Sequence, residues 1–303
     1  MNLRLLERSE IREDAWNACI REAPVSLAYA MSWYLDAVCA GQWKALVLED
    51  YRAVMPLPYR RKWGISYLAQ PPFTQQLGIF GRCSEEEIRA FLQAIPAEYR
   101  LLDLQFHTGT PTTLSGIKPR TTYWLNLSAP YPELAAGYSK DARKNLRRLE
   151  ENAGPCTLKS CSDFGWQISN YRKAYGSLNT VLKDRDYARF RHALDAAAAL
   201  QQVEAYQLLD SKDNILAGGI FLKSREQWHY VLGAPTQHSE KGGVHGLIDA
   251  FIRRHANTPF VLDFEGSEIP SVAYFYAKFG ARPVYYYALH INRLPLLLRL
   301  LKK

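Results

Sequence analysis

The sequence predicts an α/β protein of the α+β kind, in which a unit with a mixed central sheet flanked by helices occurs twice in tandem. Three observations lead to this prediction. The chain has 303 residues, more than a single core of ordinary size usually contains. The second half reads as three strands, a helix, a strand, a helix and a strand, and the first half repeats this order more faintly. We expect units at residues 1–130 and 131–293, followed by a basic apolar tail at residues 294–303.

The second half gives the clearest pattern of elements. Runs rich in β-branched and aromatic residues, separated by polar turns, predict an antiparallel meander. Apolar residues at helical spacing predict the next helix, and a proline begins the last one. The expected strands are 202–210, 214–223, 227–233, 260–264 and 283–291, and the expected helices are 140–152, 163–175, 186–200, 244–255 and 270–279.

The first half carries the same order with weaker signals. Its best local feature is a capping box, in which Ser84 precedes Glu87 at the start of a helix. The expected strands are 43–50, 52–58, 65–70, 101–106 and 121–127, and the expected helix is 84–95.

Composition and charge narrow the class of protein. A hydrophobic content of 48% is typical of a globular chain with buried cores. A net charge of +8 favours an anionic partner such as a phosphorylated cofactor, a nucleotide-linked substrate, RNA or a membrane surface, although an ordinary basic surface explains it as well. The five cysteines form no CxxC pair, which indicates reduced thiols, and the charged N-terminal region predicts a cytoplasmic protein.

Several residues of the second half are candidates for chemistry. Glu265 follows a predicted buried strand, where an open α/β sheet places its ligands, and could act as a general base or bind an amine. Capping the next helix is an equally good role for it. Lys241, Gly242 and Gly243 precede a helix whose free N–H groups favour a phosphate, although two glycines before a helix can also be a simple turn.

The segment SVAYFYAKFGA at residues 271–281 resembles the last signature segment of the GNAT acyltransferases. The wider stretch at residues 216–295, with DFEGS at residues 263–267, resembles the FemABX-like branch, whose members are tandem GNAT folds. This resemblance implies transfer of an acyl or aminoacyl group to an amine, which in several members belongs to a peptidoglycan precursor.

Two departures from the family pattern leave the acyl donor open. Phe275-Tyr276 stands where aminoacyl-transferring members carry Phe-Lys, which favours an acyl-CoA donor such as acetyl-CoA. The glycine loop at residues 239–244 lacks the leading Arg or Gln of the coenzyme pyrophosphate loop, which leaves aminoacyl-tRNA as the alternative donor.

The resemblance also assigns roles to single residues. Tyr276 would be the general acid that protonates the departing thiolate, and Lys278 would contact the coenzyme. His229 lies on the third strand of the meander, where it could act as a base, and backbone N–H groups near Leu232 and Gly233 would polarise the acyl carbonyl. Packing against the sheet is the competing explanation for both Tyr276 and His229.

Further residues are candidates for binding the acceptor. Tyr34, Arg60 and Gln75 lie in or near a polar, proline-stiffened region of the first unit and could line an acceptor cleft between the copies. Arg143 belongs to a basic helix whose cations could contact the phosphates of a nucleotide-linked or tRNA substrate, or simply be solvated. The basic helix also contains Lys140, Lys144, Arg147 and Arg148.

Absent motifs and the tail complete the prediction. The sequence contains no Walker loop, no HExxH and no GxSxG motif, so we expect neither a metal site nor a covalent intermediate. The tail could touch an anionic membrane or pack as a short helix. The sequence thus predicts an N-acyltransferase that works by direct transfer, with an aminoacyl-tRNA-dependent peptidoglycan transferase and a non-catalytic ligand-binding protein as alternatives.

Overall fold

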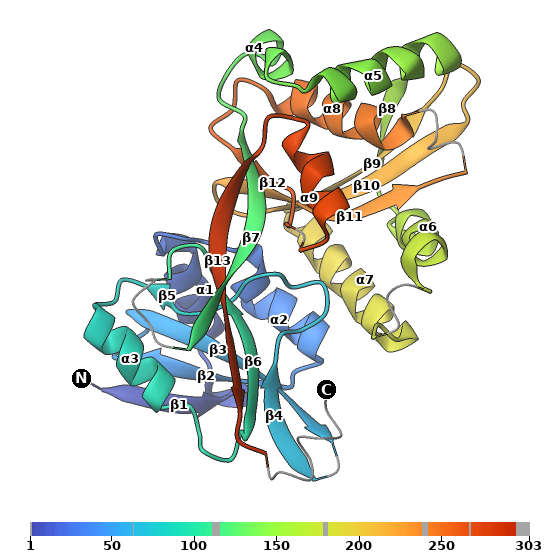
Figure 1. Ribbon diagram of the computed structural model, residues 1–303. Helices are drawn as coiled ribbons and strands as arrows, with labels where there is room; N and C mark the ends of the chain where they lie inside the picture. Colours follow the sequence, from blue (N-terminus) through green and yellow to red (C-terminus); the bar gives the residue numbers. More distant parts are fainter. Residues whose placement is uncertain are drawn as a thin grey trace. The chain divides into compact units, whose positions relative to one another are not determined.

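The computed structural model describes residues 2–62, 64–110, 116–177, 181–237, 242–266 and 268–294. The chain divides into two compact units (Figure 1). Unit 1 comprises Met1–Arg120 and Tyr285–Lys303, and unit 2 comprises Thr121–Val284. Each unit contains a mixed sheet with helices beside it, so the predicted fold class is confirmed.

Unit 1 begins with a strand and two helices that were not expected from the sequence. The strand β1 is an exposed edge strand, and its sequence LRLLE has no regular apolar alternation to reveal it. The elements of this unit are β1 (Leu3–Glu7), α1 (Glu13–Glu22), α2 (Ser32–Cys39), β2 (Trp43–Leu48), β3 (Ala53–Lys62), β4 (Ile65–Ala69), β5 (Phe80–Gly81), α3 (Glu85–Gln93) and β6 (Leu101–Phe106).

Unit 2 contains the elements that the sequence predicted best. Its strands β9, β10 and β11 form the expected meander, and β8 adds an exposed edge strand that was not expected. The elements are α4 (Tyr131–Ala136), α5 (Lys140–Ala153), β8 (Thr157–Cys161), α6 (Gly165–Tyr175), α7 (Asp184–Ala199), β9 (Val203–Leu209), β10 (Ile215–Lys223), β11 (Gln227–Pro235), α8 (Gly243–His255), β12 (Val261–Asp263) and α9 (Pro270–Ala277).

Two long strands belong partly to each unit. The strand β7 (Ile117–Asn126) crosses from unit 1 into unit 2, where its residues 124–126 pair with β12. The strand β13 (Arg282–Asn292) crosses in the other direction, and its residues 287–292 pair with β6. The division between the units therefore departs from the expected boundary at residue 130. The strand expected to end the first copy, β7, pairs with β12 of unit 2. The strand expected to end the second copy, β13, pairs with β6 of unit 1.

The two units share one strand order. Among the described residues, unit 1 has the order β1-β2-β3-β4-β6-β13 and unit 2 has the order β8-β9-β10-β11-β12-β7. In each order all neighbours are antiparallel except one pair, which is β4 with β6 in unit 1 and β11 with β12 in unit 2. This shared pairing pattern is what a tandem repeat predicts.

Helices cover both faces of the sheet in unit 2. A Cβ atom added to Gly218 would lie 2.5 Å from the ring of Trp166 on α6, whereas one added to the next residue, Gly219, would lie 2.9 Å from Leu247 on α8. Because successive residues of a strand point to opposite faces, α6 and α8 pack on opposite sides of the sheet. Figure 1 shows α5 beside α8 and α7 beside α6. Burial of Phe221 and Phe251, whose rings stack 3.6 Å apart, centres the core on the α8 side.

The predicted capping box is also confirmed. The Ser84 hydroxyl accepts a bond of 3.2 Å from the backbone N–H of Glu87, and the Glu87 carboxylate accepts one of 2.9 Å from the backbone N–H of Ser84. Because both groups satisfy an otherwise free donor, this exchange fixes the start of α3.

Candidate functional site

The parallel pair of β11 and β12 is short, and the two strands part after it. The pairing joins Gln227 to Val261, Trp228 to Leu262 and His229 to Asp263. β12 ends at this point, whereas β11 continues as far as Pro235. Among the described residues, no strand pairs with residues 230–235 on this side. We call these residues the unpaired edge of β11.

A β-bulge interrupts the unpaired edge. On the other side of β11, Tyr230 pairs with Phe221 and Leu232 pairs with Ile220, so that Val231 has no counterpart in the register. A bulge bends its strand and redirects the backbone groups near it. The unpaired edge therefore presents backbone N–H groups that pair with no strand among the described residues, at the position where the sequence predicted a polarising site near Leu232 and Gly233.

A buried histidine lies where the two strands part. His229 is fully buried, and its Nδ1 lies 3.1 Å from Oε1 of Glu265. Its Nε2 lies 2.9 Å from the hydroxyl of Ser224, which precedes β11 in the turn from β10. The imidazole therefore links a buried hydroxyl to a carboxylate that is partly exposed, with 17% of its side-chain surface accessible.

Asp263 anchors this arrangement from the neighbouring strand. The register places Trp124 of β7, Asp263 of β12 and His229 of β11 side by side on one face. The Asp263 carboxylate accepts hydrogen bonds from the Thr122 hydroxyl, from Nε1 of Trp124 at 2.9 Å and from the backbone N–H of Glu265 at 2.8 Å. Three donors to one carboxylate hold it in one orientation and fix the loop that carries Glu265.

The loop after β12 is conformationally strained at this point. Glu265 has a φ of 61° and Gly266 has a φ of 37°. A left-handed conformation is uncommon for a residue other than glycine and costs on the order of 1 kcal/mol. Backbone strain of this kind concentrates at functional sites, and here it directs the Glu265 side chain toward His229.

The carboxylates change the charge of His229. Burial by itself disfavours the imidazolium, but the hydrogen bonds and charges of Asp263 and Glu265 outweigh it and raise the pKa of His229 to about 9. At neutral pH both ring nitrogens therefore carry hydrogen and donate, one to Ser224 and one to Glu265.

Tyr276 lies beside the same group. Its ring stacks on Phe264, the residue between the two carboxylates, with the ring centres 5.0 Å apart. Burial raises the pKa of the Tyr276 phenol, and the charge of Glu265 raises it further. The structure thus brings together three residues that the sequence proposed as catalytic, namely His229, Glu265 and Tyr276, within unit 2. Their catalytic roles remain predictions.

Three further tyrosines take part in the raised phenol pKa values at this place, and two of them, Tyr171 and Tyr175, were not predicted from the sequence. The phenols of Tyr171 and Tyr175 on α6 add to the rise in the Tyr276 pKa, and Tyr230 on β11 is coupled to Tyr276 and Tyr175 in the same way. A Cβ atom added to Gly233 would lie 2.2 Å from the Tyr230 hydroxyl, so this glycine leaves room for the phenol. Tyr171 and Tyr175 are one helical turn apart, a spacing that could have indicated their shared face.

The glycines before α8 have a packing reason of their own. Cβ atoms added to Gly242 and Gly243 would lie 2.8 Å and 2.7 Å from the carbonyl oxygens of Asn145 and Leu216. Lys241, which precedes these glycines in the predicted phosphate site, lies outside the described residues. Lys278, predicted to contact the coenzyme, forms an ion pair of 2.5 Å with Asp141 of α5.

The predicted acceptor residues of unit 1 lie apart from these groups in the sequence. Tyr34 is fully buried, and its hydroxyl donates to the carbonyl of Phe73. The amide oxygen of Gln75 accepts a bond of 2.6 Å from Gln76, and Arg60 is half-buried on β3. Tyr34 thus has a structural partner, and its predicted role in binding, like those of Arg60 and Gln75, stays a prediction.

One group of ligand-type atoms occurs among the described residues. His229, Asp263 and Glu265 each offer one such atom, and these atoms lie within 4.8 Å of one another. The hydrogen bonds described above engage all three side chains without an ion. The absence of a metal site stays a prediction.

No protein-family model matches the chain, and no curated protein matches it. Among solved structures, FemX is 12% identical over 100% of both chains, with a TM-score of 0.68. L-PGS from Bacillus licheniformis is 13% identical over 96% of this chain and 95% of its own, with a TM-score of 0.53. A tandem GNAT protein from the clavulanic acid biosynthesis pathway is 11% identical over 97% of this chain and 99% of its own, with a TM-score of 0.50.

The chain has a FemABX/GNAT-like fold. The resemblance inferred from the segments at residues 216–295 is therefore confirmed at the level of the fold. Within the part of the chain that the structure describes, no helix combines the length and the apolar character needed to cross a membrane.

Proposed function

We propose that this protein is an N-acyltransferase that moves an acyl group directly from an activated donor to an amine at the unpaired edge of β11. The observation that carries the proposal is the parting of β11 and β12 after His229 and Asp263. It leaves backbone N–H groups beside Glu265 and Tyr276, which supply a carboxylate and a phenol. The full-length likeness to FemX and to a tandem GNAT protein supports the same class of reaction.

The groups present are sufficient for direct transfer. The acceptor amine attacks the acyl carbonyl, and backbone N–H groups near Leu232 and Gly233 stabilise the oxyanion that forms. The bond between the carbonyl carbon and the donor sulfur or oxygen then breaks. Glu265 takes the proton that the amine loses, and the Tyr276 phenol gives a proton to the leaving group. No covalent intermediate with the protein is needed.

His229 and Asp263 act on the position and charge of Glu265. The imidazolium of His229 donates to Glu265, and Asp263 holds the backbone N–H of the same residue. A base held in one orientation loses little entropy when the substrate arrives. Neither His229 nor Asp263 is exposed, so both are positioning residues in this proposal.

Space for a ligand exists where β11 ends. A hollow of about 690 Å³ there is lined by Trp166 and Lys173 of α6, by Pro235, the last residue of β11, and by Gln237 after it. A donor that lies along the unpaired edge would pass from this hollow toward Tyr276. Acyl-CoA is the donor we propose first, because Phe275-Tyr276 stands where aminoacyl-transferring members have Phe-Lys.

Aminoacyl-tRNA is the second candidate donor. The carbonyl oxygen of Asn145 lies close beside Gly242 at the start of α8. A carbonyl oxygen repels a phosphate, so this contact weakens the case for a coenzyme pyrophosphate at that point.

A protein that kept the fold for ligand binding without catalysis is a third candidate. For the acceptor we propose the amine of a small molecule or of a peptidoglycan precursor, in the cytoplasm.

Donor identity separates these candidates. Calorimetric titration of the protein with acetyl-CoA, and in parallel with bulk tRNA, is the decisive measurement. Micromolar binding of the coenzyme, about 8 kcal/mol, would establish the first candidate and would justify a screen of amine acceptors. Salt-sensitive tRNA binding without coenzyme binding would establish the second. No binding of either would leave only the non-catalytic protein.

A further inference from the structure

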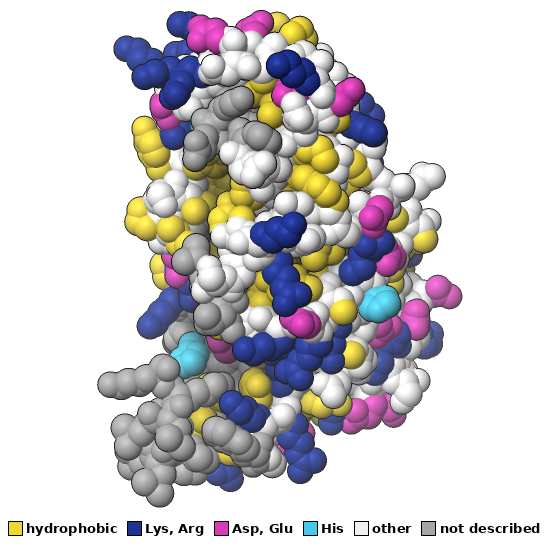
Figure 2. Space-filling model, turned by 90° about the vertical axis from the view of Figure 1, so that its right-hand side faces the viewer, with side chains coloured by type: hydrophobic (Ala, Val, Ile, Leu, Met, Phe, Trp, Pro, Cys, Tyr) yellow, Lys and Arg dark blue, Asp and Glu magenta, His cyan; other side chains and the backbone are white. Residues whose placement is uncertain are grey.

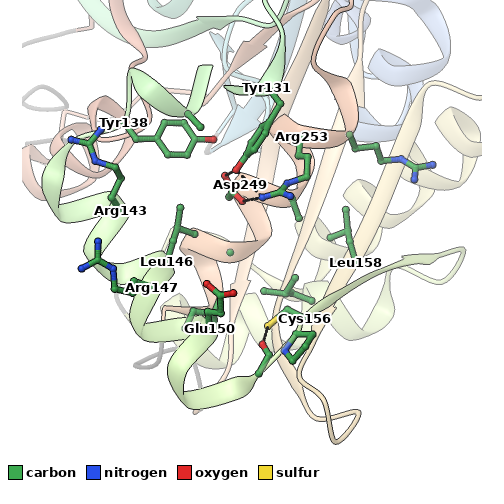
Figure 3. Close-up of a pocket in the computed structure, with 18 residues that line it drawn as sticks. Tyr131, Tyr138, Arg143, Leu146, Arg147, Glu150, Cys156, Leu158, Asp249 and Arg253 are labelled. Atoms are coloured by element: carbon green, nitrogen blue, oxygen red, sulfur yellow. Dashed lines mark hydrogen bonds and ion pairs between the residues drawn. The ribbon is translucent and has the colours of Figure 1, made fainter. Parts of the chain in front are cut away.

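A second hollow in unit 2 lies away from the proposed reaction site. Helices α5 and α8 form its walls, and the edge strand β8 and its neighbour β9 contribute to its floor (Figure 3). Its volume is about 790 Å³. We call it the arginine groove. The proposed transfer reaction uses none of its residues.

Arginines line both walls of the groove. Arg143 and Arg147 come from α5, and Arg253 and Arg254 come from α8. Among the described residues that line the groove, the acidic ones are Glu150 and Asp249, so the cations there are in excess. Figure 2 shows Lys and Arg side chains gathered at the top of the molecule, the level at which Figure 1 places α5.

The four arginines differ in their engagement with the protein. Arg253 is held over the ring of Tyr131 at 4.2 Å, donates to the Tyr131 hydroxyl at 2.9 Å and lies 3.7 Å from Asp249. Arg143 donates only a long bond of 3.3 Å to the carbonyl of Ala136. Among the described residues, Arg147 has no ion pair. Asp249 thus neutralises Arg253, whereas the exposed cations of α5 stay available to a ligand.

The floor between these walls is aliphatic. Leu146 and Leu158 lie half-buried there beside Leu149 and Leu208, which are almost completely buried. In Figure 3 the side chains of Leu146 and Leu158 stand on opposite sides of the hollow, and the guanidinium groups of Arg143 and Arg147 lie outside its centre. The groove therefore combines a cationic rim with an apolar interior.

The described aromatic rings that line the groove are not available for stacking. Tyr131 has its face covered by Arg253, and only 2% of the Tyr138 surface is exposed. Proteins that bind single-stranded nucleic acids place bases on open aromatic faces, which this groove lacks.

We propose that the arginine groove binds a phosphate ester that carries an aliphatic group. The phosphate would lie at the rim, where guanidinium groups bind its oxygens in a planar, bidentate manner. The aliphatic group would cover the leucines of the floor. Both an anionic phospholipid at a membrane surface and a free alkyl phosphate have this chemistry.

The experiment compares two double variants of the same helix. Arg143→Glu with Arg147→Glu reverses both α5 cations that line the groove. Lys144→Glu with Arg148→Glu makes the same change in net charge, at the same spacing and on the same helix, at positions that do not line it. Binding of hexyl phosphate is measured by calorimetry, with inorganic phosphate as the reference ligand. Binding of vesicles is measured by co-sedimentation, with phosphatidylcholine alone and with added phosphatidylglycerol.

The groove variant should lose affinity for hexyl phosphate by about tenfold or more, since each charged hydrogen bond contributes strongly. The control variant should stay within about threefold of the original protein, as expected of exposed charges. A loss for hexyl phosphate together with a loss of phosphatidylglycerol-dependent vesicle binding would identify a membrane lipid, and a loss for hexyl phosphate with no vesicle binding by the original protein would identify a free phosphate ester. Equal losses in both variants, or no binding of hexyl phosphate by the original protein, would overturn the proposal.

A third variant tests the aliphatic part and does not alter the charge. Leu158→Gln should weaken hexyl phosphate more than inorganic phosphate, because only the former contacts the floor. Equal binding of the two phosphates by the original protein would contradict an aliphatic subsite. Tighter binding of a single-stranded oligonucleotide than of hexyl phosphate would assign the groove to nucleic acid instead. Thermal unfolding of each variant shows whether it is folded.

Discussion

The two units use the same parallel strand pair in opposite ways. In unit 1 the chain after β4 folds back, and Leu77 forms a parallel bridge with Phe106 of β6. The backbone N–H of Leu77 donates to Gln105, and that of His107 donates to Leu77, so residues 70–77 occupy the place where the strands would part. In unit 2 the corresponding place is the unpaired edge of β11. One fold thus gives a closed sheet or an unpaired edge, depending on the segment that follows the third strand of the meander.

Each unit also buries one histidine near this place, and the two differ in charge. Nε2 of His107 donates to the carbonyl of Ile79 at 2.6 Å, and its Nδ1 accepts from the backbone of Gly109 at 3.1 Å. Burial lowers the pKa of His107, which stays neutral. His229 instead lies beside two carboxylates and is charged. A neutral histidine completes a structure, whereas a charged one can orient a base.

The largest effect should come from the carboxylate beside the unpaired edge. Glu265→Gln should lower the rate of acyl transfer by about 10²- to 10⁴-fold, because the amide cannot accept the proton from the amine. The matched control is Asp103→Asn in unit 1, which occupies the position in β6 that Asp263 has in β12. Steady-state kinetics should show less than about a twofold change for this control. Full activity of the Glu265 variant would remove that residue from the mechanism.

Removal of Asp263 should have the largest effect on stability. Asp263→Ala removes one of the two carboxylates beside the charged His229 and leaves three hydrogen-bond donors without their acceptor, which should cost about 3–5 kcal/mol of unfolding free energy. The counterpart Asp103, whose side chain is 61% exposed, should lose no more than about 0.5 kcal/mol on substitution by alanine. Urea denaturation measures both. Similar losses at the two positions would mean that the network around His229 is not special.

The two buried histidines should give opposite pH dependences. The pKa of His229 is raised to about 9 in the folded protein, so its contribution is complete below about pH 6.5 and disappears as the pH rises through 9. The loss should be on the order of 3 kcal/mol. The lowered pKa of His107 has the reverse sign, since acidification below about pH 6.5 protonates the unfolded chain first.

Denaturation at about pH 5, 7 and 9 with single His→Gln variants tests these signs. The His229 variant should lose the alkaline slope and keep the acid one. The His107 variant should do the opposite. Unchanged alkaline behaviour without His229 would show that its imidazole is neutral in the folded state.

A smaller catalytic effect is expected from the phenol at the same site. Tyr276→Phe should reduce kcat by about 10- to 100-fold for a donor with a poor leaving group. The effect should shrink for a donor whose leaving group needs no proton. Tyr274→Phe is the control, because Tyr274 lies on the same helix with 63% of its surface exposed. Equal rates for the Tyr276 variant and the original protein would indicate a packing role.

The smallest effect on stability is expected for the segment at residues 70–77 of unit 1, which fills the place where β4 and β6 would part. The Gln70 side chain donates to the carbonyl of Thr74 at 3.0 Å and accepts from the backbone of Gln105 at 3.1 Å. Gln70→Ala should therefore cost about 1–2 kcal/mol. The exposed Gln93 at the end of α3 offers a control with little expected change. Faster hydrogen exchange at the backbone N–H groups of Leu77 and His107 in the Gln70 variant would show that the bonds between this segment and β6 have weakened.

The sequence predicted most elements of both units, because their signals are local. Helical spacing, turn residues and the Ser84 capping box depend on neighbours in the chain, and the helices α5 to α8 begin and end within a few residues of the predicted positions. The edge strands β1 and β8 were missed because exposed strands lack apolar alternation. The sequence predicted the basic helix, but only the structure shows that Arg143 and Arg147 line the groove whereas Lys144 and Arg148 do not.

By itself, the sequence determined the fold class, the order of elements and the set of polar residues from which a site could be built. Only the tertiary structure decided which of them meet. The register of three strands places Trp124, Asp263 and His229 side by side, although more than a hundred residues separate the first from the others. Such pairings depend on strands that are distant in the chain, and no local periodicity encodes them. The same reason explains why local signals did not reveal that β7 pairs with β12 of unit 2 and that β13 pairs with β6 of unit 1.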